Sequence, residues 1–320
     1  MRFWEGHPEL SRELQQVRET ILLRAASDDP DVRQAVGQLF ASSGKMLRPA
    51  FVILASRFGM PDEERMIRIA AAVEMLHMAT LAHDDIIDAA PMRRGVASLQ
   101  ALRGPRTAVL VGDWLFASCF SLIADLAGDQ NGRALSHLVA RICGSEISQS
   151  ADKYVLHTSV RRYLRRIAGK TAALFALAFH VGAVESGCSS ALVSVLRRLG
   201  YSLGMGFQII DDILDFTRDD SETGKPTGSD LAQGIFTLPV VLALRSDDGH
   251  LAEALSRGSK SRRAVSQATR IVLAGSGIAG ARAAAEAYTD RAIRAIEKLP
   301  PLPARETLRE VTGQLLSRTY

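Results

Sequence analysis

Two clusters of aspartate stand inside apolar stretches of this 320-residue sequence. They are Asp84, Asp85 and Asp88 in "HDDIID", and Asp211, Asp212 and Asp215 in "DDILD". In a helix, the first and last aspartates of each cluster are four positions apart and lie on one face, about 6 Å from each other. Because like charges at this spacing destabilise a helix, each cluster predicts a bound cation.

The chemistry of the candidate ligands favours magnesium. They are all carboxylates, no histidine or cysteine stands at metal-ligand spacing beside them, and the glycine-turned loop of a calcium site is missing. Magnesium keeps few protein ligands and binds water and phosphate oxygens, so two helices that face each other across a shared cavity predict a phosphorylated ligand. The alternative is a charge cluster on a solvated helix face, which explains one copy more easily than two copies among isoleucines.

Positive residues follow or precede both clusters at turn signals. They are Lys45 and Arg48 in "SGKMLRP", Arg93 and Arg94 in "MRRG", Lys170 in "AGKTAALF", and Lys225 in "TGKPTGSD". Any one of them alone would indicate a solvated surface charge. Together with the aspartates they predict binding of a diphosphate, for which the planar fork of arginine is well suited.

Helical periodicity dominates the rest of the chain. Ile69, Val73, Leu76 and Thr80, for example, form one stripe that runs into the first aspartate cluster. Alternating strand patterns are scarce, and no long linker divides the sequence. We therefore expect a single all-α domain over residues 1–320, in which the stretch "SDDGHLAEALSRGSKSRRAV" is solvated loop and exposed helix.

Composition indicates a soluble cytoplasmic protein. The net charge of +4 and the pI of about 9.1 come from mixed charges, which do not favour a nucleic-acid partner. Cys119, Cys143 and Cys188 form no CxxC pair and are predicted to be small buried apolar residues in a reducing compartment. The first residues lack the apolar core of a signal peptide, and no uninterrupted apolar run reaches the roughly 18 residues of a transmembrane segment.

These motifs, in this order, resemble those of the trans-isoprenyl diphosphate synthases, or polyprenyl synthetases. The resemblance extends from "SSGKMLRP" through "EMLHMATLAHDDIIDAAPMRRG" and "GMGFQIIDDILDF" to "GKPTGSDLAQGIFTLP". It implies an all-α, isoprenoid synthase-type helical bundle around a deep central active-site cavity, usually in a dimer. It also implies a prenyltransferase that condenses isopentenyl diphosphate with an allylic diphosphate to give a trans-polyprenyl diphosphate.

The resemblance also implies roles for individual residues. Three magnesium ions on the allylic diphosphate would be held by Asp84, Asp85, Asp88, Asp211 and Asp212, with Asp215 in support. Contacts to the same diphosphate would come from Arg93, Lys170 and Lys225, and contacts to isopentenyl diphosphate from Lys45, Arg48, His77 and Arg94. Thr171 and Gln208 would line the region where the allylic cation forms. By spacing alone His77 is a core histidine, but its place in "EMLHMATLAHDD" matches the binding histidine of the family, whereas His83 has no matched role.

Three residues depart from the commoner family pattern. Ser43 and Met46 stand where a second glycine and an arginine are frequent, which implies a weaker or tuned isopentenyl site. Ile235 replaces a frequent lysine in "QGIFTLP", which removes one phosphate contact. None of the three changes an aspartate.

Residues before the first cluster predict the product length. Thr80 and Ala79 would lie about 6 and 7.5 Å below Asp84 along a helix, at positions where family members that stop early carry bulky aromatics. Because both are small here, we expect a passage past Leu76 and a product longer than geranylgeranyl diphosphate. Three aromatic residues could close it, or could equally pack in the core or a dimer interface: Trp114, Phe116 and Phe120.

Other functions remain open at this point. A shorter-chain farnesyl or geranylgeranyl diphosphate synthase would carry the same two motifs. A class I terpene cyclase would share the first cluster but usually has an asparagine, serine and glutamate pattern at the second. The chain could also be the catalytic subunit of a heteromeric synthase that needs a small partner.

Overall fold

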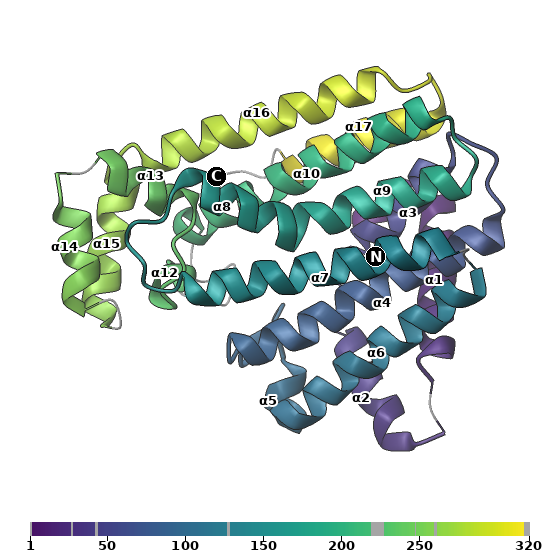
Figure 1. Cartoon of the computed structure of the whole chain (residues 1–320), viewed down its shortest axis with the longest axis horizontal. Helices are drawn as coiled ribbons and strands as arrows, with labels where there is room; N and C mark the ends of the chain where they lie inside the picture. The colour runs from purple at the N-terminus through teal and green to yellow at the C-terminus, as the bar shows by residue number, and fades with distance from the viewer. Residues whose placement is uncertain are drawn as a thin grey trace. The chain divides into compact units, whose positions relative to one another are not determined.

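The computed structural model of the chain describes residues 2–26, 28–41, 44–126, 129–218, 227–246, 248–258 and 261–316. Across these ranges the structure is helical, apart from one two-stranded sheet, and the predicted all-α class is confirmed (Figure 1). The chain falls into two compact units, Met1–Ser136 with Leu177–Leu196, and His137–Ala176 with Arg197–Tyr320. The expectation of one domain over residues 1–320 stays a prediction.

The elements that begin in the first part of the chain are η1 (Arg2–Trp4), α1 (Pro8–Arg24), α2 (Pro30–Ala41), α3 (Leu47–Ser56), α4 (Glu63–Ile87), β1 (Met92–Arg93), β2 (Val96–Ala97), α5 (Leu99–Arg103), α6 (Pro105–Leu126) and α7 (Asp129–Ala151). They are followed by α8 (Val160–Ile167), the π-helical turn η2 (Ala168–Ala172), α9 (Ala173–Glu185), α10 (Ser190–Thr217), α12 (Ser229–Ala232), α13 (Leu238–Ser246), α14 (His250–Gly258), α15 (Arg262–Ala274), α16 (Gly277–Glu297) and α17 (Pro303–Leu316).

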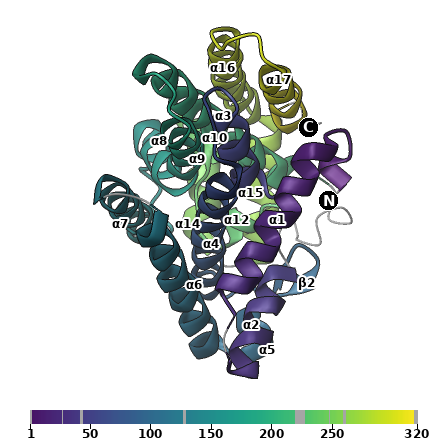
Figure 2. The same ribbon diagram turned by 90° about the vertical axis from the view of Figure 1, so that its right-hand side faces the viewer.

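Helix α4 is the central element of the first unit, because it packs against α1, α3 and α6 (Figures 1 and 2). Its start is fixed by Asp62, whose side chain accepts a hydrogen bond from the backbone N–H of Arg65 at 3.1 Å. Glu63 and Glu64 in the first turn add a favourable interaction with the helix dipole. Most of the residues between Met66 and Ala82 are buried, so α4 is a rigid support for the aspartates at its end.

The end of α4 turns sharply into a short hairpin. Asp88 is the C-cap residue, and Ala89 and Arg94 have φ angles of 47° and 50°, in the left-handed region. β1 and β2 pair antiparallel, with Arg93 opposite Val96, and Gly95 completes the turn with a φ of 81°. The hairpin therefore brings the residues after the helix back towards its last turn.

The second unit has its own apolar core, formed where α13 packs against α16 and where α14 packs against α15. One cluster of this core contains Phe216 of α10 together with Val240, Leu251 and Leu255. The expectation of a solvated loop and exposed helix over α14 and α15 is therefore wrong for one face of α14. The two leucines are four residues apart, so they lie on the same side of α14 and are buried there.

By length and composition, two helical stretches could cross a membrane, Pro105–Leu126 and Val160–Glu185. In the most apolar 18-residue window of each stretch, 33% of the residues are buried in the first and 67% in the second. Core helices of soluble proteins pass the same test, so this finding is weak evidence for a membrane segment.

Candidate active site

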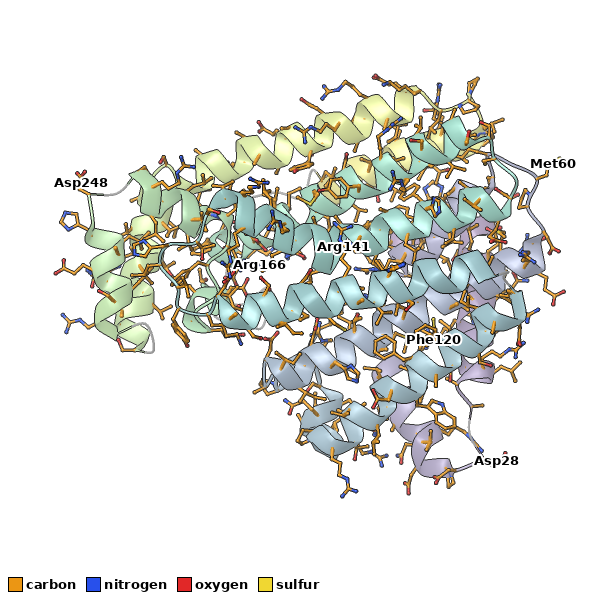
Figure 3. All side chains as sticks on the ribbon, in the orientation of Figure 1. Asp28, Met60, Phe120, Arg141, Arg166 and Asp248 are labelled. Carbon is orange, nitrogen blue, oxygen red and sulfur yellow. The ribbon has the colours of Figure 1, made fainter. Side chains whose placement is uncertain are left out.

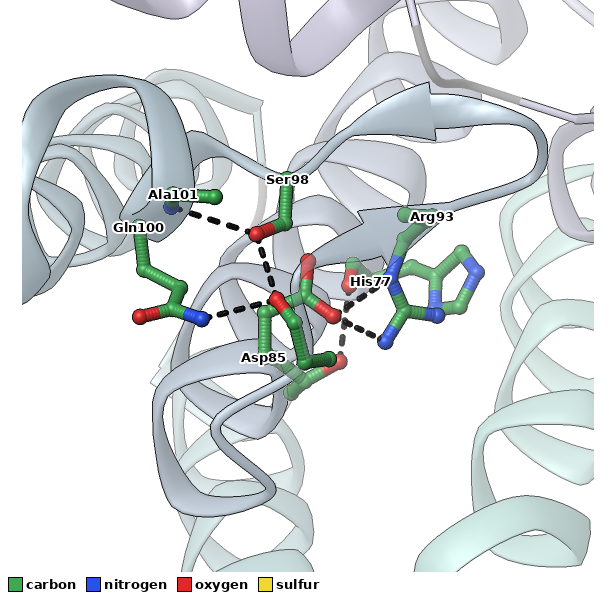
Figure 4. A network of polar contacts seen from close by, with 8 residues as sticks. His77, Asp85, Arg93, Ser98, Gln100 and Ala101 are labelled. Carbon is green, nitrogen blue, oxygen red and sulfur yellow. Dashed lines mark hydrogen bonds and ion pairs between the residues drawn. The ribbon is translucent and has the colours of Figure 1, made fainter. Parts of the chain in front are cut away.

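The first aspartate cluster lies at the C-terminal end of α4. Asp85 is 1% exposed, while Asp84 and Asp88 are half-buried. The C-terminal end of a helix carries the negative end of its dipole, which adds to the repulsion among the three carboxylates. Arg93 offsets part of this negative charge. Its Nε donates to Oδ1 of Asp85 at 2.7 Å, and its Nη2 contacts the same oxygen (Figure 4).

The hairpin that carries Arg93 is itself held in place by hydrogen bonds. The carbonyl of Ala90 accepts bonds from the Ser98 hydroxyl at 2.6 Å and the Gln100 amide at 2.7 Å (Figure 4). The N–H of Ala90 in turn donates to the carbonyl of Asp85 at 2.9 Å. These contacts fix the hairpin to the end of α4, so Arg93 is prepositioned beside Asp85.

The predicted isopentenyl-binding cations come together on the same unit. Nη1 of Arg48 lies 2.9 Å from Nε2 of His77, and Arg94 approaches Gly44, the neighbour of Lys45, so closely that a Cβ on residue 44 would meet its Nη1 at 2.0 Å. A larger residue at position 44 would therefore displace the Arg94 guanidinium. Arg48 of α3 and His77 of α4 are thus in contact, and Arg94 of the hairpin lies beside the neighbour of Lys45; their common role in binding isopentenyl diphosphate stays a prediction.

Burial and neighbouring positive charges lower the pKa values of Arg48 and His77. Burial lowers the pKa of Arg48 to about 10, with Glu74 opposing the shift and Arg94 adding to it. Burial, and then Arg48, Arg94 and Arg93, hold the pKa of His77 well below its usual value. Because a guanidinium can only donate, His77 is neutral and accepts from Arg48 through Nε2.

Glu74 is a member of this group that the sequence reasoning missed. It is 3% exposed, and burial raises its pKa while Arg48 and Arg94 oppose that shift. The signal for it was its spacing, since Glu74 is one turn before His77 and therefore lies on the same face of α4. Its carboxylate offsets part of the positive charge that α4 would otherwise have to accommodate.

The histidine in this group should make stability depend on pH. Since the pKa of His77 is lowered on folding, only the unfolded chain gains its proton as the pH falls through about 6.5, and stability is lost below that pH. The loss is at most about 1.4 kcal/mol per pH unit. In thermal unfolding followed from about pH 7 to about pH 5, we expect His77→Gln to lose less stability than the wild type, whereas the exposed His250→Gln should behave as the wild type does.

The second aspartate cluster lies in the last two turns of α10, again at the negative end of a helix dipole. Asp212 is buried, with Oδ2 accepting from the Tyr163 hydroxyl at 2.6 Å and Oδ1 accepting from the Gln208 amide at 2.9 Å. Thr171 donates to Oε1 of Gln208 at 2.7 Å and extends the chain of hydrogen bonds. Burial raises the pKa of Asp212 to about 7, and the hydrogen bonds from Tyr163 and Gln208 oppose this rise.

The other two aspartates of this cluster differ in environment. Asp211 is half-buried. Asp215 accepts from the Ser229 hydroxyl at 2.7 Å through Oδ1 and from the N–H of Asp230 at 3.3 Å through Oδ2. Both of its oxygens thus accept from α12, which Asp215 helps to orient, and its supporting role in the cluster stays a prediction.

Lys170 lies in the π-helical turn η2 and forms an ion pair with Glu146 of α7, with Nζ 2.7 Å from Oε1. Single π-helical turns are frequent at functional sites. The turn packs closely on α10, because a Cβ on Gly204 would lie 2.7 Å from the Cα of Ala172. This contact sets Lys170 and Thr171 against the helix that carries the second cluster. Lys225, the other cation predicted for this region, lies outside the described residues.

Tyr163 and Arg166 of α8 were not predicted. Tyr163 is fully buried, and the Arg166 guanidinium lies 5.5 Å from its ring centre and donates to the carbonyl of Phe236 at 3.1 Å (Figure 3 labels Arg166). Their spacing of seven and four residues before Lys170 is the signal that could have found them, because it corresponds to one helix face. Tyr163 holds Asp212 through Oδ2, the oxygen that Gln208 does not contact, and Arg166 packs on the Tyr163 ring.

The residues of α4 that were predicted to set the chain length differ in burial. Leu76 and Ala79 have no exposed surface, whereas Thr80 is half-buried and its hydroxyl donates to the carbonyl of His77 at 2.7 Å. The open passage past Leu76 therefore stays a prediction, and Thr80 is the better candidate to face a growing chain.

The aromatic residues of α6 differ in their surroundings. Trp114 is 39% exposed and donates to the carbonyl of Ala25, and Phe120 is 40% exposed (Figure 3). Phe116 packs 5.6 Å from the His83 ring. Cys119 of α6 is buried, as predicted, and its thiol donates to the carbonyl of Ala72 in α4 at 3.2 Å, whereas the prediction is wrong for Cys143, which is exposed, and for Cys188, which is half-buried. Closure of a passage by Trp114, Phe116 or Phe120 stays a prediction.

The donor chemistry of the first cluster fits magnesium. Its candidate ligands are carboxylate oxygens, and Oδ2 of Asp85 is buried with no hydrogen-bond partner among the described residues. Within the described ranges, no group of three His, Cys, Asp or Glu side chains could hold a metal ion by itself. A metal here would therefore complete its coordination with water and with phosphate oxygens of a ligand, as magnesium commonly does.

An all-helical chain with two helix-terminal aspartate clusters and associated cations has the features of an isoprenoid synthase. The family model for polyprenyl synthetase matches residues 29–272, and the chain belongs to that family. It is 38% identical over 314 residues to heptaprenyl diphosphate synthase component 2 of Geobacillus stearothermophilus, with 97% of each chain covered.

Two solved structures are similar over almost their whole length. Heptaprenyl diphosphate synthase from Staphylococcus aureus has a TM-score of 0.93 and 33% identity, with 97% of this chain and 99% of that chain covered. Polyprenyl synthase from Caulobacter crescentus, in complex with calcium and isoprenyl diphosphate, has a TM-score of 0.91 and 32% identity, with 97% and 96% covered. The all-α isoprenoid synthase fold and the trans-prenyltransferase activity predicted from the sequence are thereby confirmed.

Proposed function

We propose that the two aspartate clusters together bind the allylic diphosphate, and that the whole of residues 1–320 acts as one domain. Magnesium, about three ions, would be held by Asp84, Asp85, Asp88, Asp211 and Asp212, and the diphosphate would also contact Arg93, Lys170 and Lys225. The observation that carries this proposal is the buried, unpartnered Oδ2 of Asp85 beside Arg93, since it leaves a charged oxygen for a cation. Asp215 would support the cluster, in agreement with its two protein donors.

The isopentenyl diphosphate would bind to the group of Lys45, Arg48, His77 and Arg94. Three of these four are cations, and burial of Arg48 strengthens its interaction with an anion. His77 would keep Arg48 oriented by accepting its hydrogen bond. Met46 has a left-handed φ of 52°, which turns the chain between Lys45 and Arg48.

Condensation would begin when the allylic C–O bond breaks and its electron pair leaves with the diphosphate. Bound magnesium would supply positive charge that stabilises this leaving group. Arg93 and Lys170 would add to that charge, and Thr171 and Gln208 would lie beside the allylic cation. The terminal double bond of isopentenyl diphosphate then forms the new C–C bond, and loss of a proton, to the released diphosphate, restores a double bond.

We propose a product longer than geranylgeranyl diphosphate. The small side chain of Thr80 supports this proposal, because it is half-buried and lies about 6 Å below Asp84 along α4. The similarity to heptaprenyl diphosphate synthase component 2 also supports this proposal, because a heptaprenyl chain is longer than a geranylgeranyl chain. Chromatography of the products formed from isopentenyl diphosphate and each short allylic primer tests the proposal, and a wild-type product that stops at farnesyl or geranylgeranyl length would contradict it.

Thr80→Phe should shorten the product. An aromatic ring at this half-buried position would close the space below the first cluster, so we expect the main product to stop at about three or four units while condensation continues. Ala79→Phe is the matched comparison, because residue 79 is fully buried and a larger side chain there should lower Tm through overpacking. An unchanged product from a folded Thr80→Phe protein would show that the chain does not grow past this residue.

The active assembly is proposed to be a homodimer or a heteromer with a small partner. The name "component 2" of the Geobacillus relative supports the second arrangement. Size measurement and activity of the purified chain, with and without cell extract, distinguish the two. We place the enzyme in the cytoplasm, in keeping with its three free cysteines.

A further inference from the structure

Two aromatic residues near the start of the chain contact Lys45. The indole Nε1 of Trp4 donates to the Lys45 carbonyl at 2.5 Å, and the Lys45 ammonium lies 4.4 Å from the centre of the Phe3 ring. The two rings meet edge to face, with centres 4.8 Å apart. One pair of neighbouring residues therefore contacts both the backbone and the charged end of this lysine.

The aromatic pair is a rigid support. Trp4 has no exposed surface, and its carbonyl accepts a hydrogen bond from the N–H of His7 at 2.9 Å, at the start of α1. Helix α1 in turn packs against α3 and α4, which carry Arg48 and His77. Lys45 is thus connected through Trp4 to the same framework that holds the other residues of the isopentenyl site.

The contact to Trp4 also explains a strained backbone. Met46 adopts a left-handed φ of 52°, a conformation that costs a non-glycine residue on the order of 1 kcal/mol and persists only where the surroundings enforce it. The peptide group between Lys45 and Met46 is the one whose carbonyl Trp4 binds. The indole therefore stabilises the turn between Lys45 and the start of α3.

The choice of an aromatic partner matters for anion binding. A carboxylate beside a lysine neutralises its charge, as Glu146 does for Lys170, and competes with an anionic ligand. An aromatic face attracts the ammonium but carries no net charge, and it occupies one side of the group only. Lys45 is exposed and Phe3 half-buried, so the contact restrains the lysine at the surface of the protein.

We propose that Phe3 and Trp4 are positioning residues that hold Lys45 ready for the diphosphate of isopentenyl diphosphate. The inference rests on the proposed function, which assigns Lys45 to that ligand. A free lysine side chain must give up much of its rotamer freedom on binding, and the aromatic pair restricts that freedom beforehand. The effect should therefore appear in the binding of one substrate and not in the chemical step.

The test compares KM and kcat for both substrates in Phe3→Leu and Phe3→Tyr. Loss of the aromatic face in Phe3→Leu should raise KM for isopentenyl diphosphate by about 2- to 5-fold, with kcat and the allylic KM unchanged. Phe3→Tyr keeps the aromatic face and should restore the wild-type KM. Tyr288→Leu is the matched control, because its ring contacts Arg291 at 4.8 Å and neither residue is assigned to the site.

A Lys45→Ala variant separates this inference from the assignment on which it rests. If Lys45→Ala raises KM for isopentenyl diphosphate and Phe3→Leu does not, the positioning role is wrong and the proposed function stands. If Lys45→Ala leaves that KM unchanged, the assignment of Lys45 and the positioning role fail together. In the double variant, Phe3→Leu should add nothing to Lys45→Ala, and an additive effect would show that Phe3 acts by another route.

Discussion

Asp85→Asn should lower kcat/KM for condensation by about 10²- to 10³-fold, the loss typical when one group that stabilises developing charge is removed. The substitution keeps the shape of the side chain but removes the charge that Oδ2 offers to a cation. Asp85 is buried at the end of α4 and is held by Arg93, so no neighbouring carboxylate can replace it there. Steady-state kinetics at saturating magnesium give the ratio directly.

A second measurement distinguishes lost ligand binding from lost structure. Magnesium together with an allylic diphosphate should raise the Tm of the wild type, because a ligand that binds only the folded state stabilises it. Asp85→Asn should keep the Tm of the free protein within a few degrees and lose most of this ligand-induced rise. Asp290→Asn, which changes an exposed aspartate of α16, should retain both. Near-normal kcat/KM in Asp85→Asn would show that this carboxylate takes no part in catalysis.

The second large effect is expected at the other cluster, where Asp211→Asn should also reduce kcat by about 10²-fold or more. Asp211 is half-buried, so the change should alter stability little. Asp215→Asn makes the contrast, because the oxygens of Asp215 bind Ser229 and Asp230. Loss of one of those bonds should lower the free energy of unfolding by about 1–2 kcal/mol and affect kcat less than Asp211→Asn does.

Kinetics and denaturant unfolding of the two variants, measured side by side, test this difference. If Asp215→Asn loses as much kcat as Asp211→Asn while retaining full stability, Asp215 is a direct ligand and the supporting role is incorrect. If Asp211→Asn retains activity, the second cluster does not contact the diphosphate at all. The comparison is direct because the side chains of Asp211 and Asp215 lie one helical turn apart on the same face of α10.

Much of the architecture could be predicted because helical periodicity and the repeated aspartate spacing are local features. The stripe from Ile69 to Thr80 predicted α4, and the cluster that follows it marks the end of that helix. The position of Asp85, buried and paired with Arg93, could not be predicted, because it depends on a hairpin whose turn uses left-handed residues. A helical wheel separates Asp85 from Asp84 and Asp88 by about 100° but cannot show which of the two directions becomes buried.

Contacts between distant parts of the sequence were also beyond prediction. Tyr163 reaches Asp212 across 49 positions, and Trp4 reaches Lys45 across 41. Neither pair has a short motif, so only the packed structure joins them. The face of α14 that carries Leu251 was misjudged for a related reason, since a short helix among charged residues looks solvated until the core against which it packs is known.

The most direct test of the central claim is incorporation of isotopically labelled isopentenyl diphosphate by the purified chain with an allylic diphosphate primer. The assay is run with magnesium, with excess chelator, and with cell extract added to supply any partner. The account predicts magnesium-dependent incorporation into chains longer than geranylgeranyl, with none in chelator and almost none in Asp85→Asn or Asp211→Asn. A folded protein that incorporates no label from any primer, with or without extract, would contradict it.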